Sequence, residues 1–226
     1  MKKSAPARHD VEQLRYKFEE RRPLLEAAAR NLELETGSLL HGVPHIDRIY
    51  FRVKSRESFV AKACQVDVRS NSLKYISPFD EIEDQVAGRI LVFFDSDIEI
   101  ASKKLVSRFN RVEAKRKQPS DPNTFDYESQ HFVFTLPPEV QTDEWKCFDD
   151  LPTTFEMQVR TLFMHAWAEP QHDLEYKAKQ DLTAQDRREL AWAAASAWGA
   201  DQVLERVRRR VVGNEQTELE KGSKGG

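Results

Sequence analysis

Hydrophobic and polar positions along the chain form two kinds of pattern, one typical of helices and one typical of strands. Helical spacing of apolar residues predicts helices over 10–34, 55–68, 98–109 and 183–212, with a short acidic helix or turn over 78–83. Alternation predicts strands over 46–53, 111–113 and 128–136. A continuous apolar run within 85–95 predicts an inner strand that is buried on both faces of a sheet. Glycine and proline place loops over 36–44, 115–124 and 137–152.

The stretch from Thr154 to Lys177 changes period in its middle. It begins as a strand with one apolar face and one polar face, formed by Phe155, Met157 and Val159 against Glu156, Gln158 and Arg160. From Thr161 onward the apolar residues follow helical spacing. A carboxylate, an amide and a guanidinium on one strand face are typical of a strand that lines an active site. The alternative is an edge strand with its polar face in water.

Strands that alternate with helices and are followed by helices predict an α+β fold, a mixed β-sheet flanked by helices. We expect an N-terminal helical segment at 1–45, a core at 46–180, a C-terminal helix at 181–213 and a disordered polar tail at 214–226. The C-terminal helix has two interpretations: it packs on the core, or it forms a subunit contact in a homo-oligomer.

Composition narrows the class of protein. The 226 residues are 39% hydrophobic and 32% charged, which is typical of a globular chain, and the net charge of −3 gives no overall basic field for nucleic acid. Cys64 and Cys147 are the only cysteines and form no metal-binding motif, so we expect free thiols in a reducing cytoplasm. No apolar run is long enough to cross a bilayer, and no membrane association is expected.

A basic corner is predicted where the strand at 46–53 meets the next helix. Arg52 and Lys54 lie two residues apart on one strand face, and Ser58 and Lys62 lie four apart on the helix. Cations and a hydroxyl near a helix N-terminus are suited to a polyphosphate. By spacing alone, a solvated basic surface is at least as good an explanation.

Two further groups flank that corner in the sequence. Asp84 and Arg89 stand at the entry of the inner strand, where the carboxylate suits Mg²⁺ and the guanidinium suits stacking on a base. Tyr127, Ser129 and His131 share one side of a later strand, and that combination is able to stack a base and bind its phosphate. A simple ion pair and an ordinary exposed sheet face are the alternatives.

The polar face of the 154–160 strand completes the set. Glu156 is a second candidate ligand for Mg²⁺ or a base for an attacking hydroxyl, and Gln158 and Arg160 lie beside it on the same face. Each group is a weak indication alone.

Their order in the chain resembles the RelA/SpoT-type nucleotide pyrophosphokinases, the alarmone synthetases. The resemblance runs from about Arg52 to Lys177, and its elements are RVKSRESFVAK (52–62), DQVAGR (84–89), YESQH (127–131), EMQVRT (156–161) and WAEPQHDLEYK (167–177). It implies a fold related to nucleotidyltransferases. It also implies transfer of the β,γ-pyrophosphate of ATP to the 3′-hydroxyl of a guanosine nucleotide, GDP or GTP, with release of AMP.

The resemblance also implies residue roles. Arg52 and Arg89 are expected to sandwich the adenine of ATP, and Lys54, Ser58 and Lys62 to hold its phosphates. Asp84 and Glu156 are expected to bind Mg²⁺, with Glu156 also activating the 3′-hydroxyl. The residues expected on the acceptor side are Tyr127, Ser129, His131, Gln158 and Arg160, with Tyr127 stacking on the acceptor base.

One departure from the family pattern concerns the acceptor. The usual motif has glycine before the stacking tyrosine, whereas this chain has Asp126, which puts the standard GDP or GTP acceptor in doubt. The segment 103–117 is rich in lysine and arginine, so an alternative is a toxin-type enzyme that modifies the 3′ end of tRNA or an adenosine nucleotide and is neutralised by an antitoxin. A degenerate module that binds nucleotide without turnover is a third alternative, against which the presence of Asp84 and Glu156 argues. No hydrolase signature is found.

Overall fold

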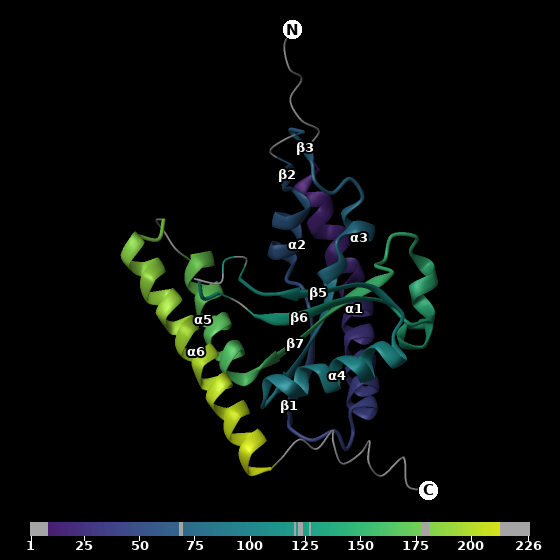
Figure 1. The fold of residues 1–226 in the computed structure, drawn as a ribbon. Coiled ribbons are helices and arrows are strands. Elements are labelled where there is room, and N and C mark those ends of the chain that lie inside the picture. Colours follow the sequence, from purple (N-terminus) through teal and green to yellow (C-terminus); the bar gives the residue numbers. More distant parts are fainter. Residues whose placement is uncertain are drawn as a thin grey trace, which may run out of the picture.

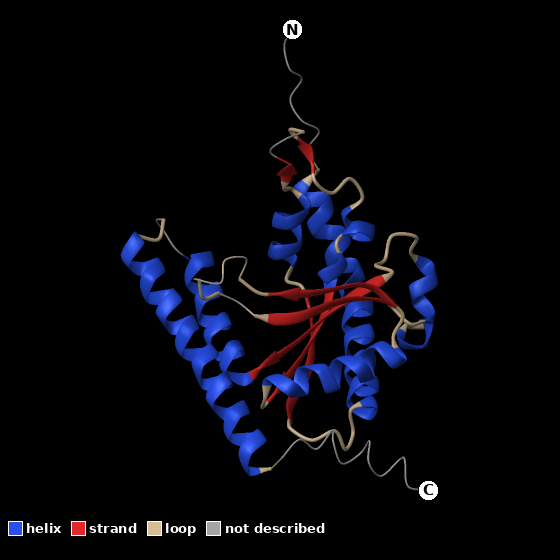
Figure 2. Cartoon of the chain, viewed as in Figure 1, coloured by secondary structure: helices blue, strands red, loops and turns tan. Residues whose placement is uncertain are grey.

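The computed structural model describes residues 9–67, 70–119, 121, 124–126, 128–177 and 181–212, and it folds as a mixed sheet flanked by helices (Figures 1 and 2). The helices are α1 (Val11–Leu39), α2 (Arg56–Ala63), α3 (Pro78–Glu81), α4 (Asp95–Arg108), α5 (Leu162–Lys177) and α6 (Ala184–Val211). Short 3₁₀ turns lie at Glu83–Gln85, Pro138–Val140 and Asp143–Cys147. The strands are β1 (Ile46–Val53), β2 (Val66–Asp67), β3 (Ser72–Leu73), β4 (Val86–Val92), β5 (Arg111–Lys117), β6 (Ser129–Thr135) and β7 (Thr154–Thr161).

The main sheet has five strands in the order β1-β4-β7-β6-β5. Within it β4 and β7 pair in parallel, and the other neighbours pair antiparallel. The chain passes from β4 to β7 through α4, β5 and β6, so the parallel pair has the long crossover that it requires. The predicted inner strand is confirmed, since β4 is paired on both sides and β7 lies at the centre.

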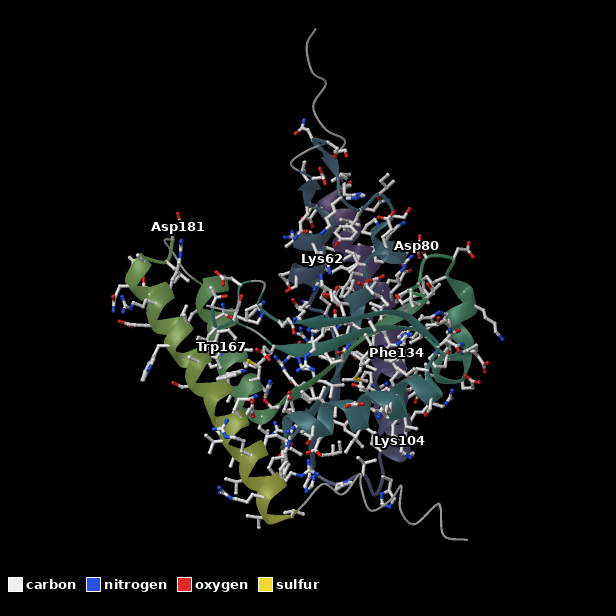
Figure 3. The ribbon with its side chains drawn as sticks, viewed as in Figure 1. Lys62, Asp80, Lys104, Phe134, Trp167 and Asp181 are labelled. Carbon is white, nitrogen blue, oxygen red and sulfur yellow. The ribbon has the colours of Figure 1, made fainter. Side chains whose placement is uncertain are left out.

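One face of the sheet is the hydrophobic core. Alternate residues of β1, β4, β6 and β7 bury their side chains there, and α1 and α4 contribute to the same cluster; Phe134 is a labelled member in Figure 3. Gly88 is required at this face, because an added Cβ would lie 2.6 Å from the Phe51 ring and 2.8 Å from the Met157 methyl group. The opposite face of the same strands keeps its polar residues available for a site.

A second small core joins α5 to α6, which lie side by side in Figure 1. Trp167, labelled in Figure 3, donates its indole N–H to the Leu190 carbonyl at 3.1 Å, and Ala194 and Ala197 pack beside it. Farther along α6, Glu205 accepts a hydrogen bond from the Ser96 hydroxyl at 2.9 Å. The C-terminal helix therefore packs on the core. In the described part of the chain, no helix combines the length and apolar character needed to cross a membrane.

Several predicted boundaries are wrong for identifiable reasons. Residues 36–39 were expected in a loop but continue α1, where the buried side chain of Thr36 keeps the last turn packed. The helix expected over 55–68 ends at Ala63, and 66–67 instead pair with 72–73 as β2 and β3. Residues 115–117 were expected in a loop but complete β5, an exposed edge strand whose lysines and arginines hide the strand pattern. The predicted tail and the first eight residues lie outside the described residues.

Candidate active site

Strand register assembles a polar row across the open face of the sheet. Tyr50 lies opposite Arg89, Arg89 opposite Gln158, Gln158 opposite His131, and His131 opposite Lys115. Residues that are directly opposite in a sheet share a face, so one side chain from every strand of the main sheet joins this row. A neighbouring row places Arg52 opposite Ala87, and Ala87 opposite Glu156. Between Arg52 and Glu156, Ala87 contributes only a methyl group to this row.

Asp84 lies between two lysines at the end of these rows. Its Oδ2 accepts a hydrogen bond from Lys54 Nζ at 2.6 Å, and its Oδ1 accepts one from Lys62 Nζ at 3.0 Å. Burial alone would lower the pKa of Lys62, but the charge and hydrogen bond of Asp84 outweigh it and raise that pKa. Lys62 is therefore cationic at neutral pH, and Lys54 and Lys62 gather around Asp84 as a cation cluster that forms part of the predicted basic corner.

Glu156 is held ionised by its donors. Its Oε1 accepts hydrogen bonds from Gln158 Nε2 at 2.7 Å and from His131 Nδ1 at 2.9 Å when that nitrogen carries the proton. Burial works against the charge, but the hydrogen bonds of His131 and Gln158, with the nearby charges of His131 and Lys117, lower the pKa of Glu156 to about 2. Glu156 also acts electrostatically on Lys62, so the two predicted carboxylates share one electrostatic environment.

Arg89 is fixed beside the row by two oxygen atoms. Its Nη1 donates to the Tyr50 hydroxyl at 3.0 Å and lies 2.6 Å from Glu169 Oε1. Arg160 is 2% exposed and donates from Nη2 to the same Glu169 oxygen at 2.8 Å. The two guanidinium groups are thus joined through one carboxylate of α5.

The predicted residues differ in how closely the structure gathers them. Hydrogen bonds bring together Lys54, Lys62 and Asp84 in one group, and His131, Glu156 and Gln158 in another. Ser58 lies in the first turn of α2, where its backbone N–H is capped by Ser55, and Arg52 is exposed on the same strand face as Lys54. Tyr127 lies outside the described residues.

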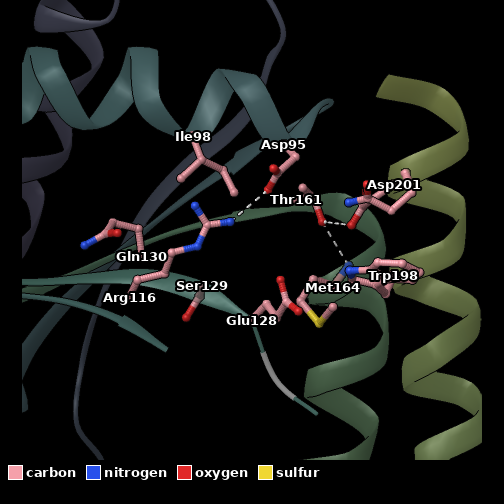
Figure 4. Close-up of a pocket in the computed structure, with 11 residues that line it drawn as sticks. Asp95, Ile98, Arg116, Glu128, Ser129, Gln130, Thr161, Met164, Trp198 and Asp201 are labelled. Carbon is pink, nitrogen blue, oxygen red and sulfur yellow. Dashed lines mark hydrogen bonds and ion pairs between the residues drawn. The ribbon is translucent and has the colours of Figure 1, made fainter. Parts of the chain in front are cut away.

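Ser129 and Arg160 are placed differently from the rest. The Ser129 side chain is buried, and it lies at a cavity of about 20 Å³ between β6, β7 and α6 that Figure 4 shows. Arg160 lies behind Arg89 and makes its contact with α5. Both residues are thus more enclosed than the exposed face that the sequence suggested.

Three residues near the site were not singled out as site residues from the sequence. Tyr50 and Glu169 fix Arg89, and Lys117 acts on Glu156 from β5. The alternation of β1 already placed Tyr50 on the face of Arg52, and Glu169 stands in the quoted 167–177 motif. Lys117 belongs to the basic segment 103–117 that the sequence indicated as a candidate phosphate-binding patch, but it was assigned to a loop and not to a strand beside Glu156.

The carboxylates of Asp84 and Glu156 have the oxygen chemistry that Mg²⁺ prefers. Glu156 is ionised with a pKa of about 2, and Asp84 lies between two ammonium groups, so both offer hard carboxylate oxygens. Within the described residues no group of three or more histidine, cysteine or acidic side chains could hold a metal ion alone. Mg²⁺ is commonly held by one or two carboxylates together with substrate phosphates, so these residues fit an ion that binds with a nucleotide.

Comparison with known proteins agrees with this geometry. A family model described as "Region found in RelA / SpoT proteins" matches residues 51–181. Among curated proteins of Bacillus subtilis (strain 168), GTP pyrophosphokinase YjbM is 28% identical over 212 residues, covering 91% of this chain and 87% of its own. GTP pyrophosphokinase YwaC is 27% identical over 179 residues, covering 77% of this chain and 79% of its own.

Solved structures share the fold. Small alarmone synthetase 1 from Bacillus subtilis superposes with a TM-score of 0.70 at 23% identity, covering 88% of this chain and 99% of that one. The same synthetase bound to its product pppGpp gives a TM-score of 0.69 at 25% identity, covering 86% of this chain and 98% of that one. The region that matches the family model, residues 51–181, contains both the cation cluster and the group formed by His131, Glu156 and Gln158.

Proposed function

The chain belongs to the RelA/SpoT family, and from that premise we propose that it is an ATP-dependent nucleotide pyrophosphokinase. The β,γ-pyrophosphate of ATP passes to the 3′-hydroxyl of a guanosine nucleotide, GDP or GTP, and AMP leaves. The observation that carries this proposal is the pair of carboxylates, Asp84 and Glu156, set beside the Lys54–Lys62 cluster on one open sheet face. Such transfer relies mainly on positioning and charge neutralisation, which these residues supply.

ATP occupies the half of the face formed by β1, α2 and β4. Lys54, Lys62 and Ser58 hold its phosphates, and the two lysines exchange part of their contact with Asp84 for phosphate oxygens. Arg52 of β1 lies opposite Ala87, and Arg89 follows Ala87 by two residues on the same face of β4. The planar guanidinium groups of these two arginines contact the two faces of adenine. The fixed position of Arg89 against Tyr50 supports this role.

The reacting centre lies at Glu156. Asp84 and Glu156 would hold Mg²⁺ together with a bound nucleotide, and the ion would supply neutralisation of negative charge on the transferred group. Because the pKa of Glu156 is about 2 in the free site, it is a weak base, and charge neutralisation is the role that it fits better. His131 and Gln158 keep the carboxylate oriented by their hydrogen bonds.

The acceptor occupies the half formed by β6 and β5. His131 lies directly opposite Lys115, and Lys117 lowers the pKa of Glu156, so this half is cationic as an acceptor with 5′-phosphates requires. The exposed basic strand also favours the second candidate, a toxin-type enzyme that transfers pyrophosphate to the 3′ end of tRNA. Asp126 adds a carboxylate where the family pattern has glycine, so an adenosine nucleotide belongs among the acceptors to be tested.

The proposal is tested with γ-³²P-labelled ATP, Mg²⁺ and separate acceptors: GDP, GTP, ADP, ATP and bulk tRNA. Label on GDP or GTP supports the guanosine acceptor, and label on tRNA or an adenosine nucleotide alone supports the second candidate. Asp84→Asn is expected to lower the transfer rate by about 100-fold or more, since a charge-neutralising group is lost. Asp80→Asn is the matched control, because Asp80 is an exposed acid of the preceding helix. Transfer to no acceptor contradicts the proposal.

A further inference from the structure

Glu169 has an unusual position for a half-exposed carboxylate, because one of its oxygens contacts two arginines. Oε1 lies 2.6 Å from Arg89 Nη1 and 2.8 Å from Arg160 Nη2, and His165 Nδ1 is 3.8 Å away. Burial lowers the pKa of His165, as does the charge of Arg160, so the imidazole is neutral at pH 7. The group therefore holds two cations and one anion, and it carries a net positive charge toward the sheet face.

The two arginines differ in what they are able to reach. The Arg160 side chain is 2% exposed, whereas Arg89 is 13% exposed and lies in the row with Gln158 on the open face. A buried guanidinium needs a carboxylate nearby, and Glu169 meets that need for Arg160. The same oxygen then fixes the outer Arg89, whose Nη1 also donates to the Tyr50 hydroxyl at 3.0 Å. Two acceptors on one nitrogen restrict where this guanidinium lies.

We infer that Glu169 is a positioning residue for ATP: anchored by buried Arg160, it holds the Arg89 guanidinium in place to receive the purine ring. The inference rests on the proposed function, since it assigns the purine of ATP to Arg89. An arginine that is already fixed loses less rotamer freedom when a ring stacks on it, so preorganisation strengthens binding. Adenine is neutral, so the nearby carboxylate does not repel it. Glu169 lies on α5, and this helix thereby contributes to a site that is otherwise formed by the sheet and α2.

The test compares Glu169→Ala and Glu169→Gln in the full chain with Glu99→Gln as matched control. Glu99 lies on α4, is largely exposed and forms an ion pair with Lys103, four residues further along the helix. The measurements are the KM for ATP, kcat, and calorimetric binding of α,β-methylene-ATP with Mg²⁺. Glu169→Ala is expected to raise the KM and the dissociation constant about 10-fold and to change kcat less than threefold. Glu169→Gln keeps an acceptor oxygen and is expected to restore part of the affinity.

A purely structural role is separated by the choice of nucleotide. If Glu169 positions Arg89 for the purine, its loss lowers the preference for ATP over CTP as donor, which a general loss of stability would not do. Unchanged KM and preference in both variants, or a parallel fall of kcat and melting temperature with the preference retained, overturns the inference. If Glu169→Ala does not fold, Glu169→Gln alone decides by the same readouts. Failure of the unaltered chain to bind the ATP analogue overturns the proposed function instead.

Discussion

Two partly buried carboxylates near β7 are held in opposite ways. Glu156 lies near the start of the strand, where two side-chain donors lower its pKa to about 2. Asp201 of α6 packs against the end of the strand, where burial raises its pKa to about 6 and the charges of Asp95 and Glu128 add to the effect (Figure 4). Thr161 donates to Asp201 Oδ2 at 2.6 Å, and within the described part of the chain Asp201 Oδ1 has no hydrogen-bond partner.

The difference shows what separates a site from a packing contact. Burial disfavours ionisation of both groups, and the neighbours decide the outcome. Around Glu156 the neighbours are donors and a lysine, whereas around Asp201 they are one hydroxyl and two further carboxylates. A carboxylate that stays ionised at neutral pH suits the neutralisation of a metal ion or cationic side chains beside phosphate, whereas the ionisation of Asp201 lowers the stability of the folded chain. The two ends of β7 are therefore expected to respond oppositely to neutralisation.

The largest effect on activity is expected at Glu156, near the start of β7. Glu156→Gln removes the charge that we assign to Mg²⁺ and the transferred group, so kcat should fall by about 1,000-fold or more. The free energy of unfolding should fall by up to about 3 kcal/mol at neutral pH, because a neutral amide replaces a carboxylate whose folded pKa of about 2 lies well below its unfolded value. Radiolabelled transfer and urea unfolding measure the two quantities. Transfer within tenfold of the unaltered rate would remove Glu156 from the reacting centre.

Asp201→Asn should produce the reverse result, higher stability with unchanged transfer. Asp201 titrates near 6 in the folded chain and at about 3.9 when unfolded, so the native state binds more protons between these values. Stability is therefore lost as pH rises from about 4 to about 6, by up to about 3 kcal/mol. The variant should exceed the unaltered chain by about 1–3 kcal/mol at pH 8 and show little advantage at pH 4.5.

Glu156 supplies the contrast in the same unfolding series. Its folded pKa of about 2 lies below its unfolded value of about 4.3, so its contribution is present above about pH 4.3 and is lost as pH falls toward 2. The stability difference between Glu156→Gln and the unaltered chain should be constant from pH 5 to 8. A pH-independent difference for Asp201→Asn would show that the two carboxylates are not opposed.

Gly88 of β4, which lies opposite Met157 in the middle of β7, is expected to tolerate no added side chain, because the core there is tightly packed. At Gly88→Ala the new methyl group meets the Phe51 ring and the Met157 side chain, so unfolding free energy should fall by about 1–3 kcal/mol. Thermal unfolding measures the loss, and Gly199→Ala is the matched control, since a Cβ there meets nothing within 4 Å. Equal effects of the two substitutions would mean that the core at Met157 has room to adjust.

The sequence predicted the surroundings of Glu156, near the start of β7, far better than those of Asp201, which packs against the end of β7. Alternation placed Glu156 and Gln158 on one face, and the spacing of charged residues placed Lys54 and Lys62 in one basic corner, although their common contact with Asp84 was not predicted. These predictions succeeded because strand and helix periods fix the direction of neighbouring side chains. The sheet itself was predicted for the same reason.

Contacts between distant segments had no such signal. Asp201 meets Thr161 and Glu169 meets Arg89 only after α5 and α6 pack, and no local period encodes that packing. The basic strand β5 was partly missed because alternating charge on an edge strand resembles a solvated loop. Long-range packing, rather than residue chemistry, limited what the sequence could show.

The smallest effect is expected from Thr161→Val, which removes the hydroxyl that donates a hydrogen bond to Asp201. The substitution is nearly isosteric, and the lost hydrogen bond should lower unfolding free energy by about 1–2 kcal/mol. Because the hydroxyl stabilises the ionised carboxylate, the loss should be larger at pH 8 than at pH 4.5. In the Asp201→Asn background the loss should shrink at pH 8, and a double-mutant cycle by urea unfolding measures this coupling. If both losses are equal and independent of pH, Thr161 acts through its bond to the Met164 N–H, at 3.1 Å, and the opposition between the ends of β7 rests on the burial of Asp201 and on Asp95 and Glu128.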